Sequence, residues 1–185
     1  GQTSSKTSQE YSISFVKNLD LALDLKVDKF RFSEFSAEKI SGQLGIKNGV
    51  VKGENISLLA NEGSYAGDFT IDTRTENYYI LAANLNGKKI NVHQLFNSFS
   101  NFGQDVIKAE NIYGTADLSV QYFSRMSPGL DIDVSTIEMT SNLKIKDGNL
   151  KNYDPLMALS DFAAIDELKD VRFATLENNI SIKDS

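Results

Sequence analysis

The chain has 185 residues, a hydrophobic fraction of 41% and a net charge of −6, values typical of one globular domain with its own core. It has no cluster of Lys or Arg, which argues against nucleic-acid binding and against electrostatic docking on anionic lipid headgroups, because both need gathered positive charge. It also has no cysteine, which excludes thiol catalysis, disulfides and thiolate metal sites.

The chain opens on a polar run, GQTSSKTSQE, without an initiator Met or a signal peptide. We interpret residues 1–10 as a tag remnant and linker. Residues 11–185 are interpreted as a single β-rich domain, part of a longer protein. No apolar run approaches the roughly 18 residues that a membrane-spanning helix needs, so the sequence predicts no span.

The first clear pattern is LDLALDLKV at residues 19–27, in which every odd position is aliphatic. A period of two predicts a strand with one apolar and one polar face. Alternation continues to residue 72, and Asn48-Gly49 predicts a type I′ hairpin turn, since both positions of that turn need positive φ. The apolar face lines either a sealed core or a lipid groove, and its candidate residues are Leu21, Leu23, Leu25, Val27, Phe30, Phe32, Leu44 and Ile46.

Two segments have helical spacing instead. In residues 90–103 the apolar positions Val92, Leu95, Phe96 and Phe99 recur at i, i+3, i+4 and i+7, and Gly103 is placed to end the helix. In residues 152–170 a proline at the first helical position follows a capping aspartate. We expect Phe96, Phe99 and Phe162 to pack the two helices onto the sheet, since each buried large side chain contributes roughly 1.5–3 kcal/mol.

Strand patterns fill the remainder, and one of them repeats. LGIKNGVVK at residues 44–52 and LKIKDGNLK at residues 143–151 share the pattern L-x-I-K-[N/D]-G-x-[V/L]-K, and the final ISIKDS begins it again. We expect a second hairpin at Asp147-Gly148 and a third interrupted at the chain end. The predicted fold is mainly β: a strongly twisted or curled antiparallel sheet of about ten strands with two packed short helices.

No residue constellation indicates catalysis. His93 is the only histidine, and it is interpreted as an exposed helix residue because a zinc site needs more ligands and a Ser-His-Asp site needs a nucleophile elbow. The acidic pairs Asp20/Asp24 and Asp131/Asp133 are interpreted as polar strand faces, because calcium loops supply six to eight oxygens at a different spacing. We therefore expect no enzyme activity, no cofactor and no metal.

The order of these elements resembles the C-terminal region of the AsmA-like family of Gram-negative envelope proteins. The resemblance runs from Leu19 to the chain end through the hairpins, through the G-x-x-x-L-x-V strand in NIYGTADLSVQY and through the D-G segment that leads into a helix. The matching residues are Leu21, Leu23, Leu25, Phe32, Ile46, Gly49, Val51, Leu58, Tyr65, Gly67, Ile71, Phe173, Leu176, Ile180 and Ile182.

This resemblance implies a non-enzymatic envelope-biogenesis module, part of a bridge-like protein that handles phospholipid transfer or outer-membrane assembly along a hydrophobic groove. It implies a periplasmic location, attachment to the inner membrane through an N-terminal anchor outside this sequence, and neighbouring repeats of the same chain as partners. The alternative is a structural or protein-interaction β-domain with a closed core and no ligand.

Overall fold

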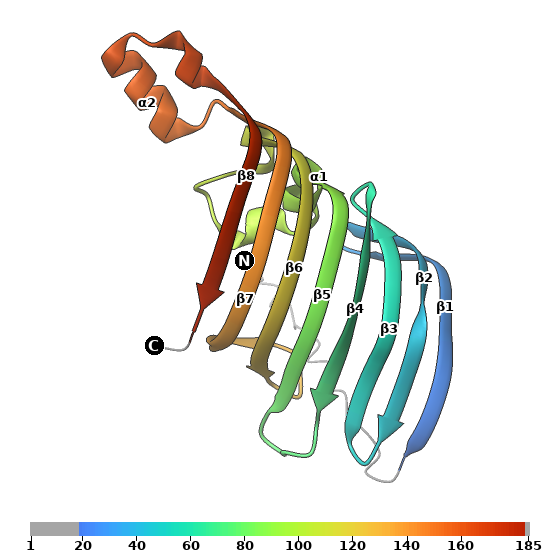
Figure 1. The fold of residues 1–185 in the computed structure, drawn as a ribbon. Helices are drawn as coiled ribbons and strands as arrows, with labels where there is room; N and C mark the ends of the chain where they lie inside the picture. The colour runs from blue at the N-terminus through green and yellow to red at the C-terminus, as the bar shows by residue number, and fades with distance from the viewer. Residues whose placement is uncertain (1–18, 184–185) are drawn as a thin grey trace, which may run out of the picture.

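The computed structural model describes residues 19–183, which form one eight-stranded antiparallel sheet with the strands in sequence order (Figure 1). Residues 1–10, interpreted from the sequence as a tag remnant and linker, lie outside the described residues. The strands are β1 (Asp20–Phe32), β2 (Phe35–Lys47), β3 (Val50–Ala60), β4 (Gly63–Asp72), β5 (Tyr79–Asn91), β6 (Ile112–Met126), β7 (Ile132–Lys151) and β8 (Asp170–Ile182).

Tight turns set the register of the first strands. The predicted turn between β2 and β3 is confirmed: Asn48 has φ of 49° and Gly49 has φ of 73°, the left-handed pair that a type I′ turn requires. The β3–β4 turn has the same character, with φ of 49° at Asn61 and 61° at Glu62. These turns connect adjacent strands directly, which favours an antiparallel meander.

Cross-strand pairing places the apolar positions of successive strands on one side of the sheet, here called the inner face. Leu23 pairs with Leu44, and the row continues through Gly53 and Phe69 to Ala83. Because directly paired residues share a face, one row can be followed from β1 to β8. Its remaining members are Tyr122, Met139 and Ile182.

Short helices lie on one side of the curved sheet, near the end drawn uppermost in Figure 1. The helix α1 (Val92–Ser98) follows β5 and leads into the 3₁₀ turns η1 (Ser100–Gly103) and η2 (Ala109–Asn111). The ring of Phe99 lies 5.6 Å from the ring of Phe35 on β2, so the upper end of the sheet bends round this segment. The core cluster there comprises Ala37, Ala60, Tyr65, Ile90, Val92, Ile112, Ala116 and Ile145.

The second helix contradicts the sequence-based expectation. Helix α2 (Asp154–Ala163) and the turn η3 (Asp166–Lys169) form a projection beyond the upper end of the sheet (Figure 1). Phe162 was expected to pack on the sheet, but its side chain is 90% exposed. Helix α2 packs against the following turn η3 instead of on the sheet, and Ser160 of the helix donates a hydrogen bond to the carbonyl oxygen of Ile165.

The sheet has eight strands where about ten were expected, because residues 132–151 and 170–182 each form one continuous strand. Polar residues at 140–142 and 177–179 lie within β7 and β8, where Asn142 pairs with Asn179 and Lys144 pairs with Glu177. Asn142 donates a hydrogen bond to Asn179 at 2.7 Å, and Lys144 forms an ion pair with Glu177. Cross-strand partners of this kind stabilise a ladder without apolar side chains.

The second predicted hairpin is likewise absent. Asp147 has φ of 49°, but Gly148 does not have positive φ, and the chain continues straight on in β7. One left-handed residue produces a bulge rather than a reversal of the chain. The ring of Phe173 packs over Gly148, where an added Cβ would lie 2.0 Å from it.

Aspartates on neighbouring strands stabilise two of the bulges. The backbone N–H of Asn55 donates to Asp68 at 2.7 Å, and that of Lys89 donates to Asp117 at 3.0 Å; both bulge residues have positive φ. The Lys89 N–H, together with the charges of Lys88 and Lys146, holds the pKa of Asp117 below its ordinary value despite some desolvation. A carboxylate therefore accepts the hydrogen bond that the bulge removes from the ladder.

Replacing Asp117 with alanine is expected to lower the free energy of unfolding at pH 7 by about 1–2 kcal/mol, because the Lys89 N–H loses a charged acceptor. Since the pKa of Asp117 is lower in the folded state, its contribution is present above the unfolded value near 3.8 and is lost as the pH falls below it. Urea unfolding of both proteins at pH 7 and pH 3 measures this. The control is Asp24→Ala, on the outer side of β1. Equal losses in the free energy of unfolding of the two variants would contradict the role of Asp117 as the acceptor that stabilises the bulge.

Candidate functional site

The lower part of the inner face, at the end opposite α1, carries a continuous set of large apolar side chains. Pairing places them in adjacent rows across the sheet, without a charged residue at any of these positions. We call this set the lower inner face; it comprises Leu21, Leu23, Leu25, Leu44, Ile46, Phe69, Ile71, Leu81, Leu85, Val120, Tyr122, Met139, Ile180 and Ile182.

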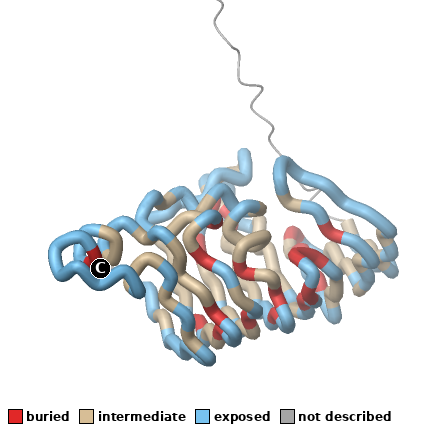
Figure 2. Tube along the Cα trace, turned by 90° about the horizontal axis from the view of Figure 1, so that it is seen from above, coloured by how far each residue is buried: buried red, intermediate tan, exposed pale blue. Residues whose placement is uncertain are grey.

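These side chains are only partly shielded from solvent. Leu23 is 47% exposed, Leu85 is 37% exposed and Ile182 is 44% exposed, at positions spread from β1 to β8. The other members are also intermediate in burial, and none belongs to the core cluster of the upper end. Figure 2 shows buried positions, in red, interspersed with intermediate and exposed positions along the strands. Val51, Ser124 and Ser141 in the same rows are buried. Among residues 19–183 this surface is therefore covered in part and open at Leu23, Leu85 and Ile182.

Part of the lower inner face lines a hollow of about 380 Å³. Ala83, Tyr122, Met139 and Ile182 contribute to its wall, but most of the lining, such as Gln121, Phe123 and Glu138, comes from the alternate, outward-facing positions of the same strands. The hollow is therefore shared between the two faces of the sheet and is about as polar as it is apolar.

The upper end of the inner face is closed by residues 92–111, here called the plug. Tyr65 donates a hydrogen bond to Asn61 at 2.9 Å, and Asn61 donates to Ser98 at 2.7 Å. Burial raises the pKa of Tyr65 to about 12. This chain of buried polar groups connects β4 to the end of α1, and a fully paired network of this kind fixes one arrangement of the elements.

The start of α1 is tied to the same turn. Asn91 caps the helix by accepting from the backbone N–H of Gln94 at 3.1 Å, a typical N-cap arrangement. Glu62 accepts from the side chains of Asn91 at 2.9 Å and Gln94 at 2.6 Å. The β3–β4 turn thus holds both ends of the helix.

The turn η1 has an uncommon backbone. Ser100, Asn101, Phe102 and Gly103 all have positive φ, which costs a residue other than glycine roughly 1–2 kcal/mol. The ring of Phe102 offsets this cost by packing against Phe96 and Phe99 at centroid distances of 5.2 and 5.5 Å. This turn ends the helix before Gly103, where the sequence pattern predicted its end.

His93 supports the plug structurally. Its Nδ1 lies 2.7 Å from the carbonyl oxygen of Ala109, its Nε2 lies 3.1 Å from the amide nitrogen of Asn97, and its ring stacks on Tyr113 at 5.1 Å. The sequence-based interpretation of an exposed histidine was therefore wrong, since the ring is half-buried and both nitrogens have partners.

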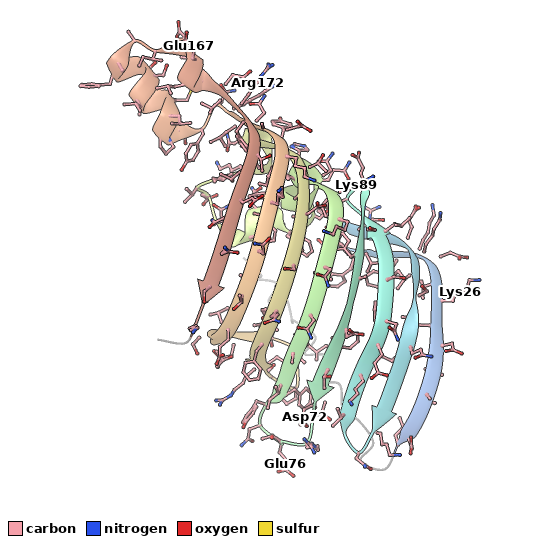
Figure 3. The ribbon with its side chains drawn as sticks, in the orientation of Figure 1. Lys26, Asp72, Glu76, Lys89, Glu167 and Arg172 are labelled. Atoms are coloured by element: carbon pink, nitrogen blue, oxygen red, sulfur yellow. The ribbon has the colours of Figure 1, made fainter. Side chains whose placement is uncertain are left out.

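Charged side chains lie on the outer face and at the margins of the sheet. Asp20 pairs with Lys47 at 2.8 Å on the first two strands, and Asp117 lies 3.5 Å from Lys146 on β6 and β7. The hydrogen bond and charge of Asp20 raise the pKa of Lys47. Figure 3 shows Lys26 projecting at the β1 edge. The two faces of the sheet thus differ sharply in polarity.

The structure brings six of the eight candidate residues together. Leu21, Leu23, Leu25 and Val27 lie on one face of β1, and they pair with the face of β2 that carries Leu44 and Ile46. Val27 lies highest and approaches the closed end. Phe30 and Phe32 lie at the upper end of β1, pair with Ala37 and Phe35, and are not part of the lower inner face.

Sequence reasoning missed the contributions of β4 to β8 to the same surface. The signal was present as alternation, for example in Tyr65, Gly67, Phe69 and Ile71. Alternation gives each strand an apolar face, but only the register shows that all these faces are on one side and which parts of them are covered.

Two other kinds of feature, a metal site and a membrane-spanning helix, are not found within residues 19–183. No group of three His, Asp or Glu side chains is placed to hold a metal ion in this range. No helix among these residues is long and apolar enough to cross a membrane. Comparisons with protein-family models, with curated proteins and with solved structures found no match.

Replacing Tyr65 with phenylalanine is expected to lower the free energy of unfolding at pH 8 by about 1–2 kcal/mol, because Asn61 loses its hydrogen-bond donor. The raised pKa means that burial of the neutral phenol stabilises the fold fully below pH 10 and progressively less as the pH rises towards about 12. Urea unfolding at pH 8 and pH 11 should show a smaller alkaline loss in the variant than in the parent. With Tyr113→Phe as the control, an unchanged alkaline loss in the Tyr65 variant would contradict this role of Tyr65.

Proposed function

We propose that this chain is a non-enzymatic module of the Gram-negative cell envelope that holds acyl chains of phospholipid against its lower inner face. The observation that carries the proposal is the partly exposed apolar surface running from Leu23 on β1 to Ile182 on β8. An acyl chain lying across the strands would cover these side chains, at a gain of about 0.8 kcal/mol per buried methylene group.

The location follows from the resemblance rather than from the site. AsmA-like proteins belong to the inner-membrane-anchored group thought to guide phospholipid along a hydrophobic groove, and the proposed place of this chain is the periplasm. In this proposal the headgroup stays outside the apolar surface, because burying a charge without a partner is costly and the lower inner face carries no charged partner.

A second candidate function is a structural β-domain in a longer repeated sheet. The observation favouring it is that the described sheet is open, with β1 and β8 at its two edges. Unpaired edges accept further strands, so neighbouring repeats of the same chain would extend the sheet and cover the surface.

The two functions are distinguished by the lipid content of the protein. The full-length protein is purified from a Gram-negative host, the bound material is extracted, and phospholipid is measured by mass spectrometry. The proposal expects phospholipid that remains bound through gel filtration. A lipid-free protein that also fails to take up added phospholipid would favour the structural module instead.

A further inference from the structure

The projection beyond the upper end of the sheet, residues 154–169, is here called the helical arm. It leaves the lower inner face unaffected, since it begins at the end of β7 farthest from that surface (Figure 1). Its role therefore needs a separate explanation, which does not depend on the proposed lipid function.

The arm has a defined internal structure. The Ser160 side chain is 2% exposed and donates to the carbonyl oxygen of Ile165 at 2.8 Å, while the N–H of Ile165 donates back to Ser160 at 3.1 Å. Ala164 ends α2 in a left-handed conformation. At the base, the N–H of Asn152 donates to the carbonyl oxygen of Lys169 at 3.0 Å. The arm is thus held in shape by its own hydrogen bonds.

Three large apolar residues of this arm are exposed. Leu159 is 49% exposed, Phe162 is 90% exposed and Ile165 is 44% exposed. Leu159 and Phe162 are three residues apart and lie on the same side of α2. An aromatic side chain presented on an ordered helix loses little conformational freedom on binding, which makes it an efficient anchor.

The surroundings of this apolar tip are acidic. The arm contains four acidic side chains and one lysine, a net charge of −3, and that lysine, Lys169, is already paired with Asp166 at 2.7 Å. Asp161 and Glu167 are exposed beside the tip, and Figure 3 shows Glu167 at the outer end of the arm. This charge opposes docking on an anionic membrane and opposes self-association of two arms.

We infer that the helical arm is the docking element for a separate protein, whose surface offers an apolar pocket for Phe162 bordered by Lys or Arg side chains. Leu159 and Ile165 flank the anchor, and the acidic residues orient the partner. Complementary charge at the rim of such an interface governs specificity and association rate, while the buried aromatic provides most of the affinity.

The test begins with a photoreactive phenylalanine analogue at position 162 of the full-length protein in living cells. The same analogue at position 134 is the matched control, because Val134 is 77% exposed and lies near the opposite end of β7. The partner crosslinked only at position 162 is identified by mass spectrometry and purified. Its affinity is then measured by titration calorimetry.

The proposal expects Phe162→Ala to weaken binding of that partner about 30-fold, the effect of losing a hot-spot aromatic, with Val134→Ala unchanged. Asp161→Lys with Glu167→Lys, or a rise from 50 to 500 mM NaCl, should weaken it about 10-fold, since salt screens exposed charges. Circular dichroism of each variant confirms that the fold is retained.

Several results would overturn the inference. They are the lack of a position-specific adduct, an adduct within the same chain or with a second copy, and a partner whose binding depends on neither Phe162 nor salt. Phe162-dependent sedimentation of the protein with phosphatidylethanolamine–phosphatidylglycerol vesicles would assign the arm to a membrane surface instead.

Discussion

Replacing Ile90 with alanine is expected to lower the free energy of unfolding by about 3–4 kcal/mol, which is within the usual range for a fully buried aliphatic side chain. Ile90 is 0% exposed, belongs to the core cluster and pairs with Ala116. Its Cδ1 atom packs against Gly63, where an added Cβ would lie 2.6 Å away. Removing three carbons at this position leaves a cavity between the sheet and the plug. Urea unfolding followed by circular dichroism measures the loss.

The matched control is Leu85→Ala on the same strand. Leu85 lies on the inner face but is 37% exposed and outside the core cluster, so its truncation should cost only about 1 kcal/mol, because less apolar area returns to water. Equal losses in the two variants would mean that the lower inner face is as well sealed as the upper end, which favours the structural module.

A triple substitution of Leu23, Leu85 and Ile182 with glutamate is expected to reduce phospholipid binding at least 10-fold. These residues span the lower inner face from β1 to β8, and each is already part exposed, so the fold should survive. An acyl chain on this surface would then have to desolvate three carboxylates, at a cost that exceeds the apolar gain. Binding is measured by extraction and mass spectrometry of phospholipid from equal amounts of folded protein.

A control with the same charge change uses the outward-facing neighbours. Ala22, Asn84 and Ser181 are exposed and each lies one or two residues from an inner position on β1, β5 or β8. Their replacement with glutamate should leave the bound phospholipid unchanged. Equal loss in the inner and outer triple variants would attribute the effect to net charge and contradict a lipid site on the inner face.

Local signals in the sequence predicted much of the sheet. The leucine alternation at residues 19–27 correctly predicted β1, and Asn48-Gly49 correctly predicted the β2–β3 turn with its left-handed residues. The helical spacing that begins at Val92 correctly predicted α1. In each case the determining interactions lie within a few residues, or in a turn whose backbone geometry permits few residue types.

The errors arose where partners distant in sequence decide the outcome. Asn142 and Asn179 are polar residues inside long strands, and their side-chain hydrogen bond links β7 to β8. The Asp147-Gly148 pair resembles the first hairpin, yet only one of its residues is left-handed. Helix α2 packs against η3 rather than on the sheet, and helical periodicity does not encode which neighbour the apolar side of a helix will contact.

The candidate site was predicted in part for the same reason. Leu21, Leu23 and Leu25 were identified because alternation is strongest there, while Leu85 and Ile182 lie in segments with weaker patterns. Whether an apolar face is covered depends on where the plug lies, and the plug is positioned by Asn61, Glu62 and Tyr65 through side-chain hydrogen bonds that span up to 37 residues.

The most direct test of the lipid site compares two leucines of similar exposure on opposite faces. Leu85 on the inner face is 37% exposed, and Leu59 on the outer face is 40% exposed. Methyl NMR spectra are recorded with a phospholipid that carries a nitroxide on its acyl chain, which broadens nearby signals. We expect the Leu85 methyl signals to disappear while those of Leu59 persist; equal broadening of both, or of neither, would contradict a lipid site on the lower inner face.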